Sequence, residues 1–297
     1  MNSVAKDTLE SITQAVMIPT GSAGVYAQTG LFEQVVDGLS VFISARREPG
    51  TEVLRFPPVM SRAQIQSSGY LESFPHLLAC VSCLHGGESD IRAMAGRPDW
   101  VAGLVATDLV LSPAACYPIY PLVASRGRIP AKGLLFDVAS YCFRREATHE
   151  IDRLQAFRMR EYVFVGTSGK VLKFRNRWMS QAAKLATQLG LPHQIAPASD
   201  PFFGRAGRIA SMSQLEQLLK FELLIALEPA RQPTACMSFN YHRDHFGTAW
   251  ALRTKAGDTA HTACVAFGIE RLALALFATH GLELRSWPAT VRKSLSL

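Results

Sequence analysis

The sequence predicts an α+β fold in which helices flank an antiparallel sheet. Segments with strand and helix patterns alternate irregularly along the 297 residues, and hairpin patterns gather in the C-terminal half. Hydrophobic residues make up 48% of the chain and charged residues 19%, as in a globular protein. No composition break marks a domain boundary. We therefore expect one domain over residues 1–297, of which residues 1–30 form an N-terminal extension.

The charge and the termini narrow the class of protein. Lys and Arg number 31 against 24 Asp and Glu, which gives a formal charge of +7 and favours anionic partners such as nucleotides, nucleic acid or an acidic protein. No apolar run reaches the ~18 residues that cross a bilayer, so we expect no membrane span. The first residues lack the apolar stretch of a secretory signal, and six cysteines are too few for a disulfide scaffold. A cytoplasmic location is therefore expected.

The N-terminal half contains one helix and two clear strands. Apolar residues recur at helical spacing over Leu31–Ser44, which predicts an amphipathic helix. Thr51–Phe56 is typical of a strand, and Pro57-Pro58 ends it because proline cannot join a central ladder. The apolar segment Leu77–Leu84 fits a helix or a strand equally well, and Leu104–Leu111 is strand-like.

The C-terminal half contains a long hairpin and three helices. Gly133–Arg144 and Phe157–Val165 have strand patterns, and the charged turn Arg145–Arg153 joins them, which predicts an antiparallel pair. Helices are expected over Lys170–Gly190, over Gln214–Leu227, and over Val265–Ala278, which begins with small residues and becomes strongly apolar.

Cys80 and Cys83 form a CxxC pattern with His85 beside it. Such a pair can serve redox chemistry or supply half of a zinc site. No second CxxC completes a four-thiolate site, and the surrounding residues are apolar. We prefer the interpretation that both are ordinary buried cysteines.

Two further patterns could bind a nucleotide. Arg144 and Glu146 end the first strand of the hairpin, and Tyr162 lies on the return strand. An arginine fork can hold a phosphate, a carboxylate can accept from an amino group, and a ring can stack; a solvated charged hairpin is the alternative. Arg271 ends the pattern Gly268-Ile269-Glu270-Arg271, which opens a predicted helix. The N-terminal end of a helix is positive, so an arginine there usually binds an anion.

Taken in order, these segments resemble motifs 1, 2 and 3 of the class II aminoacyl-tRNA synthetases. The match comprises the helix and strand that end at Pro57, the hairpin with Arg144 and Glu146, and the helix that opens with Gly268 and Arg271. Within that class the chain is similar to the zinc-dependent seryl-tRNA synthetases of methanogenic archaea. The similarity lies in Thr262–Arg271, in the Ser238-x-Asn240-x-His242 pattern, and in three residues that match the zinc ligands of that family: Cys116, Glu161 and Cys264.

The zinc set makes chemical sense, although ordinary buried thiols are the alternative. Two thiolates and a carboxylate leave one tetrahedral position open, as in a working rather than a structural zinc site. That position could take the neutral α-amine of an amino acid. Glu161 would therefore also contact the substrate.

The resemblance also implies residue roles toward ATP. Arg144 would hold the α-phosphate, Glu146 would accept from the adenine amino group, and Tyr162 and Arg271 would lie on the two faces of the adenine, with Arg271 reaching the γ-phosphate. Mg²⁺ would bridge the phosphates. Arg153 and Leu154, at the end of the motif 2 loop, would border the nucleotide. Ala235 stands where related synthetases have a Glu that holds a metal on the phosphates, and its backbone could still contact the nucleotide.

About thirty residues precede the first predicted helix, so we expect the large tRNA-binding domain of the seryl enzymes to be absent. The chain is therefore identified as a member of the amino acid:carrier protein ligases. This family implies that a small amino acid, glycine or alanine, is activated with ATP and passed to the phosphopantetheine thiol of an acidic holo carrier protein, with no tRNA charged. A homodimer is expected. Arg205 and Arg208 are candidates for carrier docking, although a solvated basic loop is the preferred alternative for them.

Two alternatives stay open at this point. One is a stand-alone synthetase paralogue that acts on tRNA, and the other is a non-catalytic paralogue that binds a nucleotide or an amino acid. His242 and His245 are interpreted as packed or surface residues rather than catalytic bases.

Overall fold

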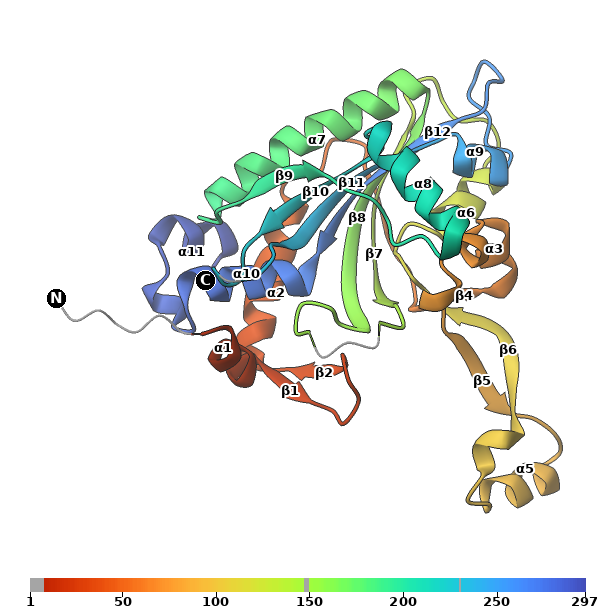
Figure 1. The fold of residues 1–297 in the computed structure, drawn as a ribbon. Helices are drawn as coiled ribbons and strands as arrows, with labels where there is room; N and C mark the ends of the chain where they lie inside the picture. Colours follow the sequence, from red (N-terminus) through yellow and green to blue (C-terminus); the bar gives the residue numbers. More distant parts are fainter. Residues whose placement is uncertain (1–7, 147–149, 230) are drawn as a thin grey trace.

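The computed structural model describes residues 8–146, 150–229 and 231–297, and a seven-stranded sheet forms the centre of this part of the chain (Figure 1). The strand order is β3-β7-β8-β12-β11-β10-β9, and every neighbouring pair is antiparallel except β3 and β7. The predicted α+β class is confirmed. The strands are β3 (Glu52–Arg55), β7 (Leu134–Phe143), β8 (Ala156–Gly166), β9 (Gln194–Pro197), β10 (Lys220–Ile225), β11 (Thr234–Arg243) and β12 (His261–Gly268).

One face of the sheet packs on long helices and forms the main core. Aromatic side chains such as Tyr162, Trp178 and Phe267 meet there and exclude water. Tyr162 and Trp178 come from the sheet and from a facing helix, with ring centroids 4.8 Å apart. The helices on this face are α1 (Leu9–Val16), α2 (Gly30–Ser44), α7 (Ser168–Gln188), α10 (Ile269–His280) and α11 (Ala289–Leu295).

The opposite face carries a second core and the cavity described below. Tyr120 of α6 (Ile119–Ser125) stacks on Phe246 of α9 (His245–Ala249), with ring centroids 3.8 Å apart. Both rings pack over Val163 and Val165 of β8. Because side chains alternate along a strand, β8 contributes its odd-numbered residues to this face and its even-numbered residues to the main core.

Several elements expected from the sequence are confirmed with small changes of bounds. The helix predicted over Leu31–Ser44 is α2, the hairpin is β7 and β8, and the helix predicted over Lys170–Gly190 is α7. α1, together with a small hairpin of β1 (Met17–Pro19) and β2 (Tyr26–Gln28), occupies the N-terminal extension. Residues 1–7 of that extension and residues 147–149 of the charged turn lie outside the described part.

The helix predicted over Gln214–Leu227 is wrong. A helix, α8 (Gly204–Glu216), ends within that segment, Leu218 adopts a left-handed conformation with φ 50°, and the chain continues as β10. The left-handed residue breaks the helix, and the apolar residues that follow alternate as a strand requires. Likewise, the first residues of Val265–Ala278 complete β12 before α10 begins.

A small sheet of β4 (Val59–Ser61), β6 (Leu104–Leu111) and β5 (Cys80–Leu84) extends from the body (Figure 1). The ambiguous segment Leu77–Leu84 is therefore mainly a strand. α5 (Glu88–Ala95) and a 3-10 helix over Trp100–Gly103 cap its outer end. Shorter helices α3 (Arg62–Ser67) and α4 (Tyr70–Ser73) follow β4.

Cys80 and Cys83 are both exposed, so the expectation that they are buried is wrong. They lie three residues apart on β5, which places their Cα atoms about 10 Å from one another at about 3.3 Å per residue. A disulfide needs less than about 7 Å, so the pair cannot form one on this strand. Among the described residues, no helix has the length and hydropathy needed to cross a lipid bilayer.

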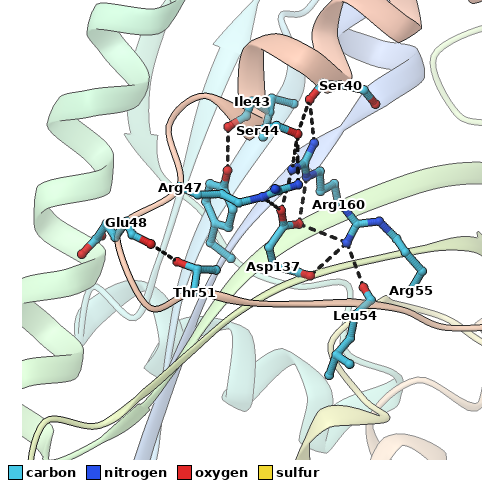
Figure 2. Close-up of polar contacts among 11 residues, drawn as sticks. Ser40, Ile43, Ser44, Arg47, Glu48, Thr51, Leu54, Arg55, Asp137 and Arg160 are labelled. Atoms are coloured by element: carbon cyan, nitrogen blue, oxygen red, sulfur yellow. Dashed lines mark hydrogen bonds and ion pairs between the residues drawn. The ribbon is translucent and has the colours of Figure 1, made fainter.

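A buried ion cluster ties α2 to the sheet (Figure 2). Asp137 of β7 is fully buried, and Arg160 of β8 binds it with both Nε (2.9 Å) and Nη2 (2.5 Å). Arg47 and Arg55 bind the same carboxylate. Arg160 also donates to the Ser40 carbonyl (2.8 Å), so one guanidinium joins the helix to two strands.

The charge of Asp137 is maintained by its arginines. Burial alone would raise the pKa of Asp137, but the hydrogen bonds and charges of Arg160, together with Arg47 and Arg55, outweigh it and lower the pKa below its ordinary value. The carboxylate is therefore ionised wherever the protein is folded near neutral pH.

We expect Asp137→Asn to lower the free energy of unfolding by about 3–5 kcal/mol, because it leaves Arg160 buried without its counter-charge. The contribution of a carboxylate with a lowered folded-state pKa is complete above about pH 4 and declines as the pH falls through the folded value. Urea denaturation at several pH values would measure this. A variant as stable as the wild type at pH 7 would contradict it.

Candidate active site

A cavity of about 410 Å³ opens on the sheet face opposite the main core. This volume suits a small-molecule or cofactor site. Ten residues were expected to bind ATP, the amino acid or zinc, and eight of them line the cavity; they come from the hairpin, from β11 and β12, from the start of α10 and from the segment between β6 and α6. These eight are Cys116, Arg144, Glu146, Leu154, Glu161, Ala235, Cys264 and Arg271.

Cys116, Glu161 and Cys264 meet at the inner wall of the cavity. All three are buried, and their ligand atoms lie within 4.8 Å of one another. Cys116 follows β6 by a short connection, while Glu161 and Cys264 lie on the adjacent strands β8 and β12. Two soft sulfurs and one carboxylate, close together and out of water, form a set that could hold a metal ion with an open coordination position.

The electrostatics of this cluster suit a bound cation. Burial raises the pKa of Glu161, and the contact with Cys116 together with burial raises the pKa of Cys264 well above its usual value. Three acidic groups so close together cannot all ionise without a counter-charge, whereas a bound divalent ion deprotonates thiol ligands outright. The residues present therefore fit a metal centre.

Neighbouring groups orient these donors. The backbone N–H of Cys116 donates to Glu161 Oε1 (2.9 Å). Asn240 Nδ2 donates to Cys264 Sγ (3.3 Å), and His242 Nε2 lies 3.6 Å from the same sulfur. His242 is packed edge-on against Phe246, as expected for a packed histidine. The sequence carried no independent signal for Asn240 as a partner of a thiol, and such outer contacts fix the geometry of metal ligands.

Two arginines also line the cavity. Arg144 donates through Nε to the Pro113 carbonyl (2.9 Å), and its guanidinium lies 5.5 Å from the centroid of the Phe157 ring. Arg271 donates to the carbonyls of Asp152 (2.7 Å) and Ala235 (3.0 Å). Each arginine is thus held by backbone oxygens, and a guanidinium fork of this kind can bind an anion.

Tyr162 does not belong to this site, and its predicted role under the adenine is wrong. It is buried on the opposite face of the sheet, where its hydroxyl donates to the Ile43 carbonyl (2.6 Å). Adjacent residues of a strand face opposite sides, so Glu161 and Tyr162 cannot both line one cavity. Phe157 shares the face of Glu161 and lines the cavity, and this period of two was the signal for it.

The two predicted residues of the motif 2 loop, Arg153 and Leu154, differ in their exposure to solvent. Leu154 is buried against the cavity, whereas Arg153 is more than half exposed and pairs with Glu146 (3.5 Å) and Glu150 (3.0 Å). The ion pair places Arg153 at the side of the cavity next to Glu146. Its contact with a nucleotide stays a prediction.

A third group of polar residues lines the cavity and was missed from the sequence. Lys220 is buried and binds Asp200 (2.6 Å) and Glu222 (2.9 Å), while Gln214 binds Asp200 (2.8 Å). The helix predicted over Gln214–Leu227 would turn Lys220 and Glu222 in different directions. On β10 they share one face and form one network.

The chain is similar to curated proteins over almost its whole length. It is 56% identical over 295 residues to amino acid–acyl-carrier-protein ligase 1 of Bradyrhizobium diazoefficiens, which covers 98% of this chain and 90% of that protein. It is also 28% identical over 196 residues to the type-2 serine–tRNA ligase of Methanopyrus kandleri, which covers 61% of this chain and 37% of that one. No protein-family model matches the sequence.

The fold is that of a known catalytic core. The M. kandleri seryl-tRNA synthetase, solved in complex with A. aeolicus tRNASec, superposes with a TM-score of 0.84 at 20% identity and covers 98% of this chain and 60% of its own. At that identity the likeness concerns the fold alone.

Proposed function

The chain belongs to the amino acid–acyl-carrier-protein ligases, and from this membership we propose that it activates a small amino acid with ATP and transfers it to the phosphopantetheine thiol of a carrier protein. It is accordingly a ligase. The observation that carries the proposal is the joint occurrence, in one cavity, of the Cys116, Glu161 and Cys264 donors and of two arginines. Glycine or alanine is the proposed substrate, and the whole of residues 1–297 acts as one catalytic domain.

The donor set fits zinc. Cys116, Glu161 and Cys264 would hold the ion, which supplies an open position for the neutral α-amine of the amino acid. Asn240 orients Cys264, and the Cys116 N–H orients Glu161, so the protein holds the donors in place before the substrate arrives.

The first half-reaction needs positioning and charge neutralisation rather than a protein nucleophile. The amino acid carboxylate attacks the α-phosphorus of ATP, the bond to the β-phosphate bridging oxygen breaks, and pyrophosphate leaves with that electron pair. Arg144 holds the α-phosphate, and Arg271 reaches the γ-phosphate. Phe157 stacks on the adenine in place of Tyr162, and Glu146 accepts from its amino group. Mg²⁺ would accompany the ATP phosphates and neutralise part of their charge.

In the second half-reaction the carrier thiol, having lost its proton to solvent, attacks the adenylate carbonyl. A thioester forms and AMP leaves. Ala235 has no polar side-chain atom, so it contributes to the nucleotide site only through its backbone. Its carbonyl accepts from Arg271 and thereby holds that arginine in place.

The carrier protein docks on α8. Arg205 and Arg208 lie on this helix rather than in a solvated loop, and they are exposed beside a stripe of exposed apolar residues, Ile209, Met212 and Leu215. The helix begins next to the cavity, because Phe202 lines the cavity and stacks on Phe74 (5.0 Å between centroids). An acidic carrier would find both positive charge and apolar contact there.

The proposal also includes a homodimer and a cytoplasmic location. All six cysteines lie in the described part of the chain and are free, which supports a reducing compartment. A supply of ATP and of holo carrier protein agrees with the same location.

Pyrophosphate exchange across the twenty amino acids tests the function. We expect exchange with glycine or alanine, followed by a mass increase of a holo carrier protein by one amino acid residue. Charging of total tRNA instead of the carrier would favour the tRNA-enzyme alternative. A lack of exchange with every amino acid would favour a non-catalytic paralogue.

Metal removal tests the cluster. We expect one zinc per chain by elemental analysis, and loss of exchange after chelation that returns when zinc is added back. Cys264→Ala removes one of three ligands and should abolish both zinc binding and exchange. Cys142→Ala is the matched control, since Cys142 is a buried thiol outside the cavity. Exchange that persists in metal-free protein would overturn the zinc assignment.

Docking on α8 predicts a selective effect. Ile209→Asp combined with Arg208→Glu should raise the KM for the carrier about ten-fold or more while leaving amino acid exchange unchanged, because neither residue lines the cavity. Kinetics of carrier loading and of exchange separate the two. An equal fall in both activities would place the defect in the fold, and unchanged loading would exclude this helix.

A further inference from the structure

Arg158 of β8 is bound by three other side chains, although it does not line the cavity. Its Nε donates to Glu270 Oε1 (2.7 Å), and its backbone N–H donates to the second oxygen of the same carboxylate (2.8 Å). Nη1 and Nη2 donate to the two carboxylate oxygens of Glu33 (2.7 and 2.9 Å), and Nη2 also donates to Gln28 Oε1 (3.2 Å). One residue therefore joins β8 to β2, α2 and α10.

Glu270 takes the place of a strand partner at the end of β12. The register of β12 and β8 ends at Gly268 and Met159. The β8 residue before Met159 is Arg158, and its N–H is accepted by the carboxylate of Glu270 in the first turn of α10. A carboxylate is favourable at that position, because the first turn of a helix is its positive end. The start of α10 is thus fixed to β8 by a side chain where the sheet pairing stops.

The Arg158–Glu270 pair, which we call the clamp, is buried and ionic. The side chains of Arg158 and Glu270 are 17% and 3% exposed. Burial alone would lower the pKa of Arg158, but the hydrogen bond to Glu33 and the charge of Glu270 outweigh it and raise this pKa above its ordinary value. Two bonds from one residue to one carboxylate also restrict the angle between the groups. The clamp therefore fixes one arrangement of β8 and α10.

The sequence neighbours of the clamp are the two residues proposed for the faces of the adenine. Phe157 directly precedes Arg158, and Arg271 directly follows Glu270. Both Phe157 and Arg271 line the cavity. Because each of them is one residue away from the clamp, the space between them depends on how the clamp holds β8 against α10.

We propose that the clamp positions the two residues that enclose the adenine, so that Arg158 affects ATP binding without touching the nucleotide. The inference rests on the proposed function, in which Phe157 and Arg271 lie on the two faces of the ring. A wider or tilted gap weakens the contacts with both faces, since dispersion contacts decline steeply with distance. The amino acid binds at the proposed zinc site, so the effect should be confined to ATP.

A conservative substitution tests this role. Arg158→Lys keeps the positive charge but loses the fork that binds two carboxylates and an amide together. We expect the KM and the Kd for ATP to rise about ten-fold, while kcat and the KM for the amino acid change less than about two-fold. Pyrophosphate exchange at varied ATP gives the kinetic constants, and calorimetric titration with ATP gives the Kd.

Glu33→Gln is the matched control. It takes a carboxylate from the same guanidinium, but both bonds between Arg158 and Glu270 remain. It should lower the melting temperature and leave the KM for ATP within about two-fold of the wild type. A clamp that served only the stability of the fold would give Glu33→Gln and Arg158→Lys the same kinetic effect, and this result would contradict the proposal.

A double-mutant cycle gives the decisive measurement. Glu270→Gln and Arg158→Lys each break the clamp, so the double variant should bind ATP no more weakly than the weaker single variant. Additive losses, or wild-type affinity for ATP in Arg158→Lys, would overturn the proposal. The titration needs no amino acid. A wild type that binds ATP but exchanges with no amino acid would therefore contradict the proposed reaction while the cycle still decides on the clamp, and a wild type that binds no ATP would overturn both.

Discussion

The rest of the structure depends on how strand β8 buries an ionisable residue on each of its two faces. Arg160 and Glu161 are successive residues, both are almost fully buried, and the pleat turns them to opposite sides of the sheet. An isolated buried charge is costly, so each side must provide an opposite charge close by. On the helix side Asp137 does so. On the cavity side the chain offers two thiols instead, so Glu161 is neutral unless a cation binds beside it.

The two faces thus solve one electrostatic problem in different ways. The helix side is closed and permanent: Arg160 joins α2, β7 and β8 and fixes how β8 lies. The cavity side holds groups whose charge depends on what binds there. A rigid backbone on one side keeps the donors of the other side at fixed positions, and this is what a ligand site needs from its scaffold.

Sequence reasoning succeeded where one periodicity was clear. α2, the β7–β8 hairpin and α7 have patterns that fit one type of element. It failed at residues 214–227, because Leu215, Leu218 and Leu219 have helical spacing while the residues from Leu219 onward also alternate as in a strand. The left-handed conformation of Leu218 ends the helix. The sequence does not indicate that conformation, because leucine rarely adopts it. The exposure of Cys80 and Cys83 was missed because apolar neighbours suggested a core, whereas they belong to a projecting ribbon.

The site was predictable in part for similar reasons. Cys116, Glu161 and Cys264 are far apart in sequence, and no spacing rule joins them; the resemblance to a known family did, and the structure brings them together. The same resemblance gave the stacking role to Tyr162, which lies on the wrong face of the sheet. Tyr162 directly follows Glu161 on β8, so the two side chains point to opposite faces. Phe157 could have been chosen from the alternation alone.

The burial of the cysteines divides them into two populations with different reactivity. Cys80 and Cys83 are open to solvent, while Cys116, Cys142, Cys236 and Cys264 are enclosed. A water-soluble alkylating dye should consequently modify the projecting ribbon and spare the buried thiols of the cavity. The molecule therefore already contains attachment points for a fluorescent or spin probe on that ribbon, and no cysteine has to be introduced or removed to place one there.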